Sequence, residues 1–253
     1  MMKRVELDES ITALKPPTVI DRLTQARVME LLFSVDQQPQ EEFRHHFANE
    51  LQLAAEAIAD GFNAYKELSD QVSIEHRNAI IMLFLHTTIN SLYSSLHLLV
   101  SGYPVPAGHM MRQFSESAAM AMLCADTELD VYARYAADPA KYPVHKAVHF
   151  VLRKDISESL RKSLAFQADG YAQFARVMKF YDKLSHISVV ALGHAIQFTP
   201  SGGLAFGPQF DPTKVEIYRL ELRRIRSACR TVRLLAAALT AVLPKKNPAP
   251  SAD

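Results

Sequence analysis

The chain has 253 residues, of which 49% are hydrophobic and 22% charged, and its formal net charge of +1 does not by itself indicate a partner. Glycine is scarce and tryptophan is absent, while Ala, Leu, Glu and Arg are plentiful, so the composition favours helices in a soluble globular protein. Cys124 and Cys229 lie far apart, which excludes a disulfide framework and a zinc spacing and indicates a reducing cytosol.

The first residues, 1–16, lack helical periodicity, and we interpret them as an arm. A helix from Thr18 to about Ser34 completes an N-terminal segment, residues 1–38. Pro39 opens a longer helix, to about Leu68, whose apolar residues recur with a period near 3.6.

The next stretch, Asn78 to Met111, contains no Asp, Glu, Lys or Arg, and such a run is typical of a protein interior or a membrane. Ser73 is expected to cap its helix, which runs from about Ile74 to Val100. Eight of the 22 residues from Ala79 to Val100 are His, Thr, Asn or Ser, so we do not expect this helix to span a membrane.

Two sets of residues in this region are expected to be buried. Helical spacing puts four polar residues on one face, where we expect them to bond to neighbouring helices: His86, Asn90, Tyr93 and His97. The core is expected to contain four apolar residues of this helix and the next: Leu83, Phe84, Phe114 and Leu123.

Further helices follow the Gly102-Tyr103-Pro104 break. They are expected at about 107–125, 127–137, 143–164 and 168–186. Alternating apolar residues around Gly202-Gly203, within 196–207, predict a small hairpin. Asp211-Pro212 then starts a last helix to about Leu243. The sequence therefore predicts an all-α bundle of seven to eight helices with one hairpin-like insert, as a single domain over 39–243, followed by a disordered tail, 244–253.

A polar centre is predicted where charged residues enter the apolar helices. Arg112 and Glu116 are four residues apart and share a helix face, where the Arg contacts an anion or the pair is an interhelical salt bridge. Tyr181, Ser185 and His186 would lie close together across one turn, and His186 is either a general base or a helix cap.

The last helix carries a row of arginines at steps of four or three residues, within about 80° of arc: Arg219, Arg223, Arg226, Arg230 and Arg233. From Lys214 to Lys246 there are nine Lys or Arg against two Glu. Such a row is either a solvated helix face or a track of contacts to the phosphates of a nucleic acid.

We expect no metal and no cofactor. Glu42 and His45 have the spacing of a di-iron ligand pair, but the chain contains no second copy of it. His145 and His149 lack the Glu of a zinc-protease motif.

Three segments together resemble bacterial all-α proteins allied to the HEPN superfamily, over about residues 74–242. They are Met111-Arg112-Gln113-Phe114-Ser115-Glu116, then Tyr181 to His186, then the hairpin-like insert before the last helix. The resemblance implies a homodimer and RNA as partner, with metal-independent RNA cleavage in a toxin or phage-defence context. The HEPN nuclease signature, an Arg followed four to six residues later by a His, is absent around His186, so the resemblance in fold does not require the nuclease activity.

Two functions follow as hypotheses for a cytosolic protein. One is HEPN-like RNA binding or cleavage with Arg112, Glu116, Tyr181, Ser185 and His186 at the centre. The other is a non-catalytic dimeric interaction module in which the same residues only hold the helices together.

Overall fold

The computed structural model describes residues 37–73, 75–146, 168–186, 188–196 and 207–245. These residues form seven α-helices and one 3-10 helix, with no strand among them, which confirms the predicted all-α fold. The elements are α2 (Gln38–Gln71), α3 (His76–Val100), α4 (Pro104–Ala125), α5 (Val131–Ala137), α8 (Ala168–Ser185), α9 (Val189–Ala195), η1 (Pro212–Lys214) and α10 (Val215–Val242). The first predicted helix, most of the helix predicted at 143–164 and nearly all of the predicted hairpin lie outside the described residues.

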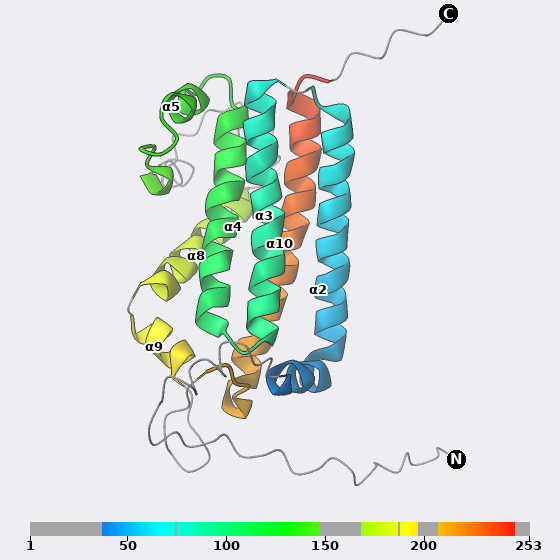
Figure 1. Ribbon diagram of the computed structural model, residues 1–253, viewed down its shortest axis with the longest axis vertical. Helices are drawn as coiled ribbons and strands as arrows, with labels where there is room; N and C mark the ends of the chain where they lie inside the picture. The colour runs from blue at the N-terminus through cyan, green and yellow to red at the C-terminus, as the bar shows by residue number, and fades with distance from the viewer. Residues whose placement is uncertain (1–36, 74, 147–167, 187, 197–206, 246–253) are drawn as a thin grey trace, which may run out of the picture.

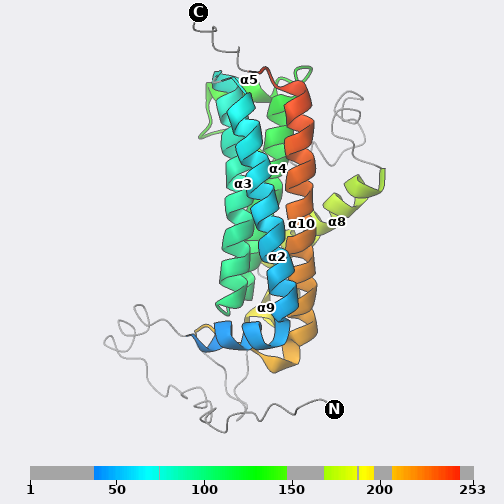
Figure 2. The ribbon, with the colours of Figure 1, turned by 90° about the vertical axis from the view of Figure 1, so that its right-hand side faces the viewer.

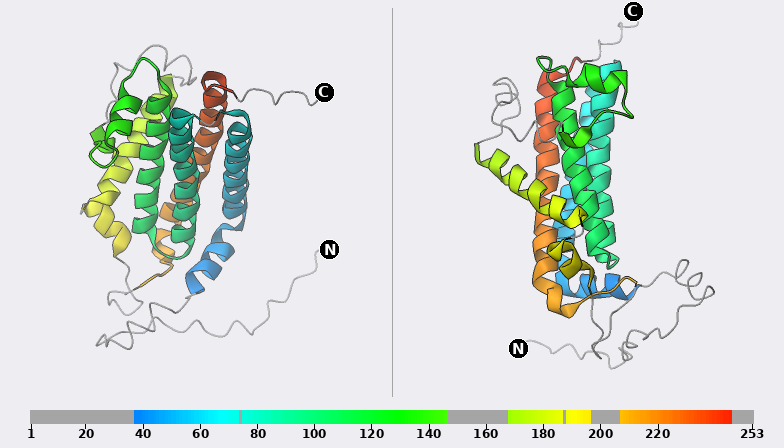
Figure 3. Two further views of the ribbon diagram at one scale, coloured as in Figure 1. Left: turned by 45° about the horizontal axis from the view of Figure 1, so that its top comes forward. Right: turned by 90° about the vertical axis from the view of Figure 1, so that its left-hand side faces the viewer.

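Four long helices, α2, α3, α4 and α10, form the bundle (Figure 1). In that view α4, α3 and α2 stand side by side, and α10 lies behind them. Helix α8 crosses the bundle obliquely on the α4 side, and α9 follows it near the base (Figure 3). The upper ends of α2 and α10 are joined, because Ser73 N donates to Pro244 O at 3.0 Å.

The turn between α3 and α4 requires a glycine. Gly102 has φ +82°, and a Cβ at this position would lie 2.6 Å from the backbone nitrogen of Gln209. The amides of Gly102 and Tyr103 donate to Leu99 O and Leu98 O, which satisfies carbonyls at the end of α3. This tight reversal places α3 and α4 antiparallel, in contact along their length.

The core is richest along α4, where every residue from Ser117 to Cys124 is buried. Phe114 is 3% exposed and Leu123 is fully buried, as predicted. The prediction for Leu83 was wrong, because its side chain is 59% exposed on the outer side of α3. Phe84 is half-buried, with its ring 5.1 Å from that of Tyr135 on α5.

Helix α2 changes direction at Phe47, whose φ of −135° and ψ of 27° are not helical. The segment before this kink lies across the base of the bundle (Figure 2). There the rings of Phe43, Phe47, Phe210 and Tyr218 form one aromatic cluster. The kink therefore lets one continuous segment form both the base and one side of the bundle.

The start of α3 differs from the prediction, because Ser73 does not cap it. The helix begins at His76, and the Ser73 hydroxyl accepts instead from Asn78 Nδ2 at 2.9 Å. In the first turn of α3, Arg77 donates to Cys124 O at 2.8 Å and to Asp126 O at 2.7 Å. A charged donor thus satisfies carbonyls at the C-terminus of α4.

Candidate functional site

The candidate site lies where the last turn of α8 meets the second and third turns of α4. Gly108 allows this approach, because a Cβ there would lie 2.9 Å from Leu184 Cδ1. Leu184 is buried, and the next residue, Ser185, faces α4. A small residue on α4 and an apolar residue on α8 therefore set the distance at which the polar residues meet.

Arg112 is the centre of a network that joins the two helices. Its Nε donates to Glu116 Oε1 at 2.9 Å on the same helix, and its Nη1 donates to Ser185 Oγ at 2.6 Å on α8. Nη1 also lies 3.3 Å from Asp182 Oδ1. The structure thus brings together Arg112, Glu116 and Ser185, and it adds Asp182, which sequence reasoning missed. The signal was present, because Asp182 and His186 are four residues apart on one helix face.

His186 reaches the same carboxylate from the end of α8. Its Nε2 lies 3.6 Å from Asp182 Oδ1, the oxygen that also faces Arg112. This separation suits an ion pair with a protonated imidazole but is too long for a hydrogen bond that would orient a general base. The His186 side chain is 67% exposed, so solvent reaches the imidazole.

The electrostatics of this network are those of a satisfied cation. Two carboxylates, Glu116 and Asp182, face one guanidinium, so a phosphate would have to displace one of them to contact Arg112. Side-chain exposures of 25% for Arg112 and Glu116 mean that these charges are partly desolvated and need their partners. The arrangement is suited to fastening α8 onto α4.

Tyr181 lies in a second polar cluster, although the sequence grouped it with Ser185 and His186. It is fully buried, and its hydroxyl donates to Glu221 Oε2 of α10 at 2.6 Å. Burial and the neighbouring Glu221 carboxylate raise the pKa of Tyr181 well above 10, so the phenol stays protonated. Arg224 pairs with the same Glu221 and lies 3.9 Å from the ring centroid of Phe180. This cluster joins α8 to α10, as the first joins α8 to α4.

The arginine row on α10 divides into one paired residue and four others. Arg219 pairs with Glu216 and with Glu50 of α2, and its guanidinium lies 5.5 Å from the Phe47 ring centroid. These carboxylates raise the pKa of Arg219. The remaining members form no ion pair with any described residue, and all but the half-buried Arg226 are exposed: Arg223, Arg226, Arg230 and Arg233.

The polar stripe of α3 faces outward, so the prediction that it is buried was wrong: His86, Asn90, Tyr93 and His97 are all exposed. The buried side of α3 carries smaller hydroxyls in their place. Thr88 Oγ1 donates to Phe84 O within the helix, and Ser95 Oγ donates to Ala107 O of α4 at 2.9 Å. Small hydroxyl groups that bond to backbone carbonyls allow α3 and α4 to approach closely, which rings would not.

The metal-ligand pairs considered from the sequence do not form a site in the described part of the chain. Glu42 lies 3.6 Å from His46, and His149 is outside the described residues. Among the described residues, no group of three or more His, Cys, Asp or Glu side chains is arranged to hold a metal ion.

Comparison with models of known protein families, with characterised proteins and with solved structures found no match.

Proposed function

We propose that this protein is a non-catalytic RNA-binding module that contacts the phosphate backbone through the arginine row of α10. The observation that carries the proposal is the set of four arginines on one helix face without an ion-pair partner among the described residues: Arg223, Arg226, Arg230 and Arg233. Guanidinium groups spaced along a helix release counterions from a phosphate chain when they bind it. The short motifs that resemble HEPN proteins point to the same class of ligand.

The non-catalytic part of the proposal rests on the network around Arg112. Its guanidinium is occupied by Glu116, Asp182 and Ser185, so no cation there is available to stabilise a phosphate in a transition state. Tyr181, which a catalytic centre would need at the surface, is buried against Glu221. Both clusters are therefore assigned to holding α8 in place.

The test is binding of a fluorescently labelled single-stranded RNA, followed by anisotropy over a series of salt concentrations. Replacing the four arginines by Gln removes up to four phosphate contacts. The plot of the logarithm of the binding constant against the logarithm of the salt concentration should therefore become shallower, its negative slope decreasing in magnitude by about 3. A matched control replaces four exposed cations elsewhere by Gln: Arg44, Arg134, Lys141 and Lys146. Both variants lose the same net charge, and only the first should lose most of its affinity.

A solvated helix face is the competing explanation for the row. It predicts that wild-type protein does not bind RNA at low salt, or that the row variant and the control lose affinity equally. Either result would overturn the proposal.

A second candidate function, metal-independent RNA cleavage, is favoured by one observation. Arg112 and His186 face the same oxygen of Asp182, so an RNA phosphate that displaced this carboxylate would meet a guanidinium and an imidazole side by side. In this case wild-type protein should cut RNA in the presence of a chelator, and His186→Ala should abolish cleavage while RNA affinity is unchanged. Intact RNA after prolonged incubation with wild-type protein would exclude cleavage and leave the binding proposal standing.

A further inference from the structure

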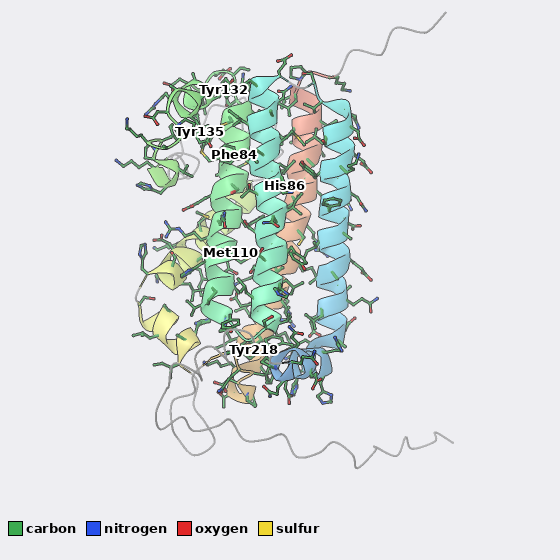
Figure 4. The ribbon with its side chains drawn as sticks, in the orientation of Figure 1. Phe84, His86, Met110, Tyr132, Tyr135 and Tyr218 are labelled. Atoms are coloured by element: carbon green, nitrogen blue, oxygen red, sulfur yellow. The ribbon has the colours of Figure 1, made fainter. Side chains whose placement is uncertain are left out.

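The exposed side of α3 carries large side chains and, after Arg77, no Asp, Glu, Lys or Arg. Phe62 of α2 is 49% exposed, and Leu83 and Tyr93 of α3 are 59% and 58% exposed. His86, Asn90 and His97 complete this surface, which we call the α2–α3 face. His86 lies near the middle of α3 on the side that no described helix covers (Figure 4).

Ring contacts make the α2–α3 face continuous across the two helices. Phe62 lies 6.2 Å from Tyr65, and Tyr65 lies 5.7 Å from His86, as measured between ring centroids. Further along α3, the rings of Tyr93 and His97 are stacked with an angle of 4° between their planes. A cluster of large, exposed and uncharged side chains of this kind marks an interaction site.

We propose that the α2–α3 face binds a second copy of this chain, with the two copies related by a twofold axis. In such an interface each residue near the axis meets its own equivalent, so an ionised side chain would face a like charge. Helix α3 has no Asp, Glu, Lys or Arg after Arg77, which fits a surface that must complement itself. The polar groups present also fit, because an Asn amide, a Tyr hydroxyl and a neutral imidazole each both donate and accept hydrogen bonds. Asn90, Tyr93 and His97 can therefore pair with their own copies.

The size of the face matches what a stable dimer needs. Helix α3 has 25 residues and is about 37 Å long, and each helix is about 10 Å across. Two adjacent helices therefore offer roughly 750 Å² per copy, close to the roughly 800 Å² per partner of a standard interface. The apolar strip on α2 extends the face, because Ile58 and Leu51 lie one and three turns before Phe62 and are half-buried.

A lipid bilayer is the other occupant that an uncharged helix suggests. Among the described residues, α3 is the one helix long and apolar enough to cross a membrane by length and composition. Its exposed side, however, carries His86, Asn90 and His97, and hydrocarbon offers no hydrogen-bond partner to such groups. A second copy supplies those partners, so we assign the face to self-association.

The test is the mass of the full chain in solution, measured by light scattering and sedimentation velocity over a range of concentrations. Wild-type protein should reach twice the 28.3 kDa of one chain. Leu83→Glu and Asn90→Asp place a charge beside the axis, and each should raise the dimer dissociation constant at least tenfold, the effect expected of a central interface residue. Leu234→Glu is the matched control, because Leu234 is 68% exposed on α10, away from this face, and this variant should dimerise like wild type.

Circular dichroism of each variant is the check that its helices are kept, so that a change in mass reports on association. Wild-type protein that stays monomeric at every concentration would overturn the proposal, and so would a dimer that Leu83→Glu leaves intact. A monomer that sediments with phosphatidylcholine vesicles, and loses this property in Leu83→Glu, would assign the face to the membrane and also overturn it. None of these outcomes depends on RNA binding, which uses α10.

Discussion

Arg112 donates to the Ser185 hydroxyl at 2.6 Å, and the same hydroxyl donates to the carbonyl of Asp182 at 3.0 Å. Two residues 73 positions apart are thereby joined, and the last turn of α8 is fixed against α4. Because Asp182 and Glu116 both face the guanidinium, removing the cation leaves two carboxylates close together. Mutations of these residues should therefore have non-additive effects on the free energy of unfolding.

Arg112→Met should lower the free energy of unfolding by about 1–3 kcal/mol, because the partly buried Glu116 loses its partner. Adding Glu116→Gln should restore part of this loss, with a coupling of about 0.5–2 kcal/mol in a double-mutant cycle. Urea denaturation followed by circular dichroism measures both. The Lys66–Asp70 pair, whose side chains are 60% and 62% exposed, is the control and should show a coupling of about 0.5 kcal/mol or less. Strictly additive effects at Arg112 and Glu116 would contradict a coupled network.

Phe114→Ala should cost about 3–5 kcal/mol, because this ring is 3% exposed and its removal leaves a cavity in the core. Leu83→Ala, at a side chain that is 59% exposed, should cost about 0.5 kcal/mol or less in the monomer. Chemical denaturation at low protein concentration separates the two. Equal losses would mean that Leu83 is covered in the monomer.

Stability should fall at alkaline pH because three buried acids must stay neutral in the folded protein. Burial raises the pKa of Cys124 and Cys229 from 9.0 to about 12 and holds that of Tyr181 well above 10. The unfolded chain releases these protons first, so their contribution is complete below pH 9 and is lost as pH rises toward 12. By pH 10 the two thiols together should account for a loss of about 3 kcal/mol.

The measurement for these thiols is the free energy of unfolding from pH 8 to pH 10 for wild type and for the Cys124→Ala, Cys229→Ala double variant. The variant has a different baseline because it loses packing, but its slope with pH should be shallower. An identical slope in the two proteins would show that the thiols do not govern this pH range.

Gly102→Ala should destabilise the protein by about 1–2 kcal/mol for the positive φ alone, and by more because the new Cβ meets the backbone at Gln209. Gly193→Ala in α9 is the matched control, since a Cβ there has no heavy atom within 4 Å. Alanine is the better helix former, so that variant should be neutral or stabilised by up to about 1 kcal/mol. Thermal denaturation of the two variants side by side tests the requirement for glycine at the turn.

Local patterns predicted much of the fold and part of the candidate site. The helix periods, the Gly102 break and the Asp211-Pro212 start are short-range signals, and the structure has α-helices or a 3-10 helix at those places. The pairing of Arg112 with Glu116 follows from a spacing of four residues. Interactions between distant helices were harder to predict, and the bond between Tyr181 and Glu221 depends on how α8 crosses α10.

The orientation of α3 shows why the buried side of this helix could not be predicted from the sequence. A helix with no charged residue over most of its length has no charged face to mark the solvent side. The choice is made by size, because Thr88, Ser91 and Ser95 fit between helices and the bulkier His86, Asn90 and Tyr93 do not. Predicting that the small hydroxyl residues face inward would have required knowing how closely α4 packs against α3.

The contact between α2 and α10 has a consequence for the order in which the chain folds. Glu50 and Arg219 pair across 169 residues of sequence, whereas α3 and α4 are joined by a short turn. Loop closure over a long distance is slow compared with formation of a helical hairpin. During synthesis, α2, α3 and α4 leave the ribosome well before α10, so the apolar sides of α2 and α4 that α10 covers remain open until the last helix arrives. We therefore expect the nascent chain to depend on chaperone protection until about residue 242 has emerged.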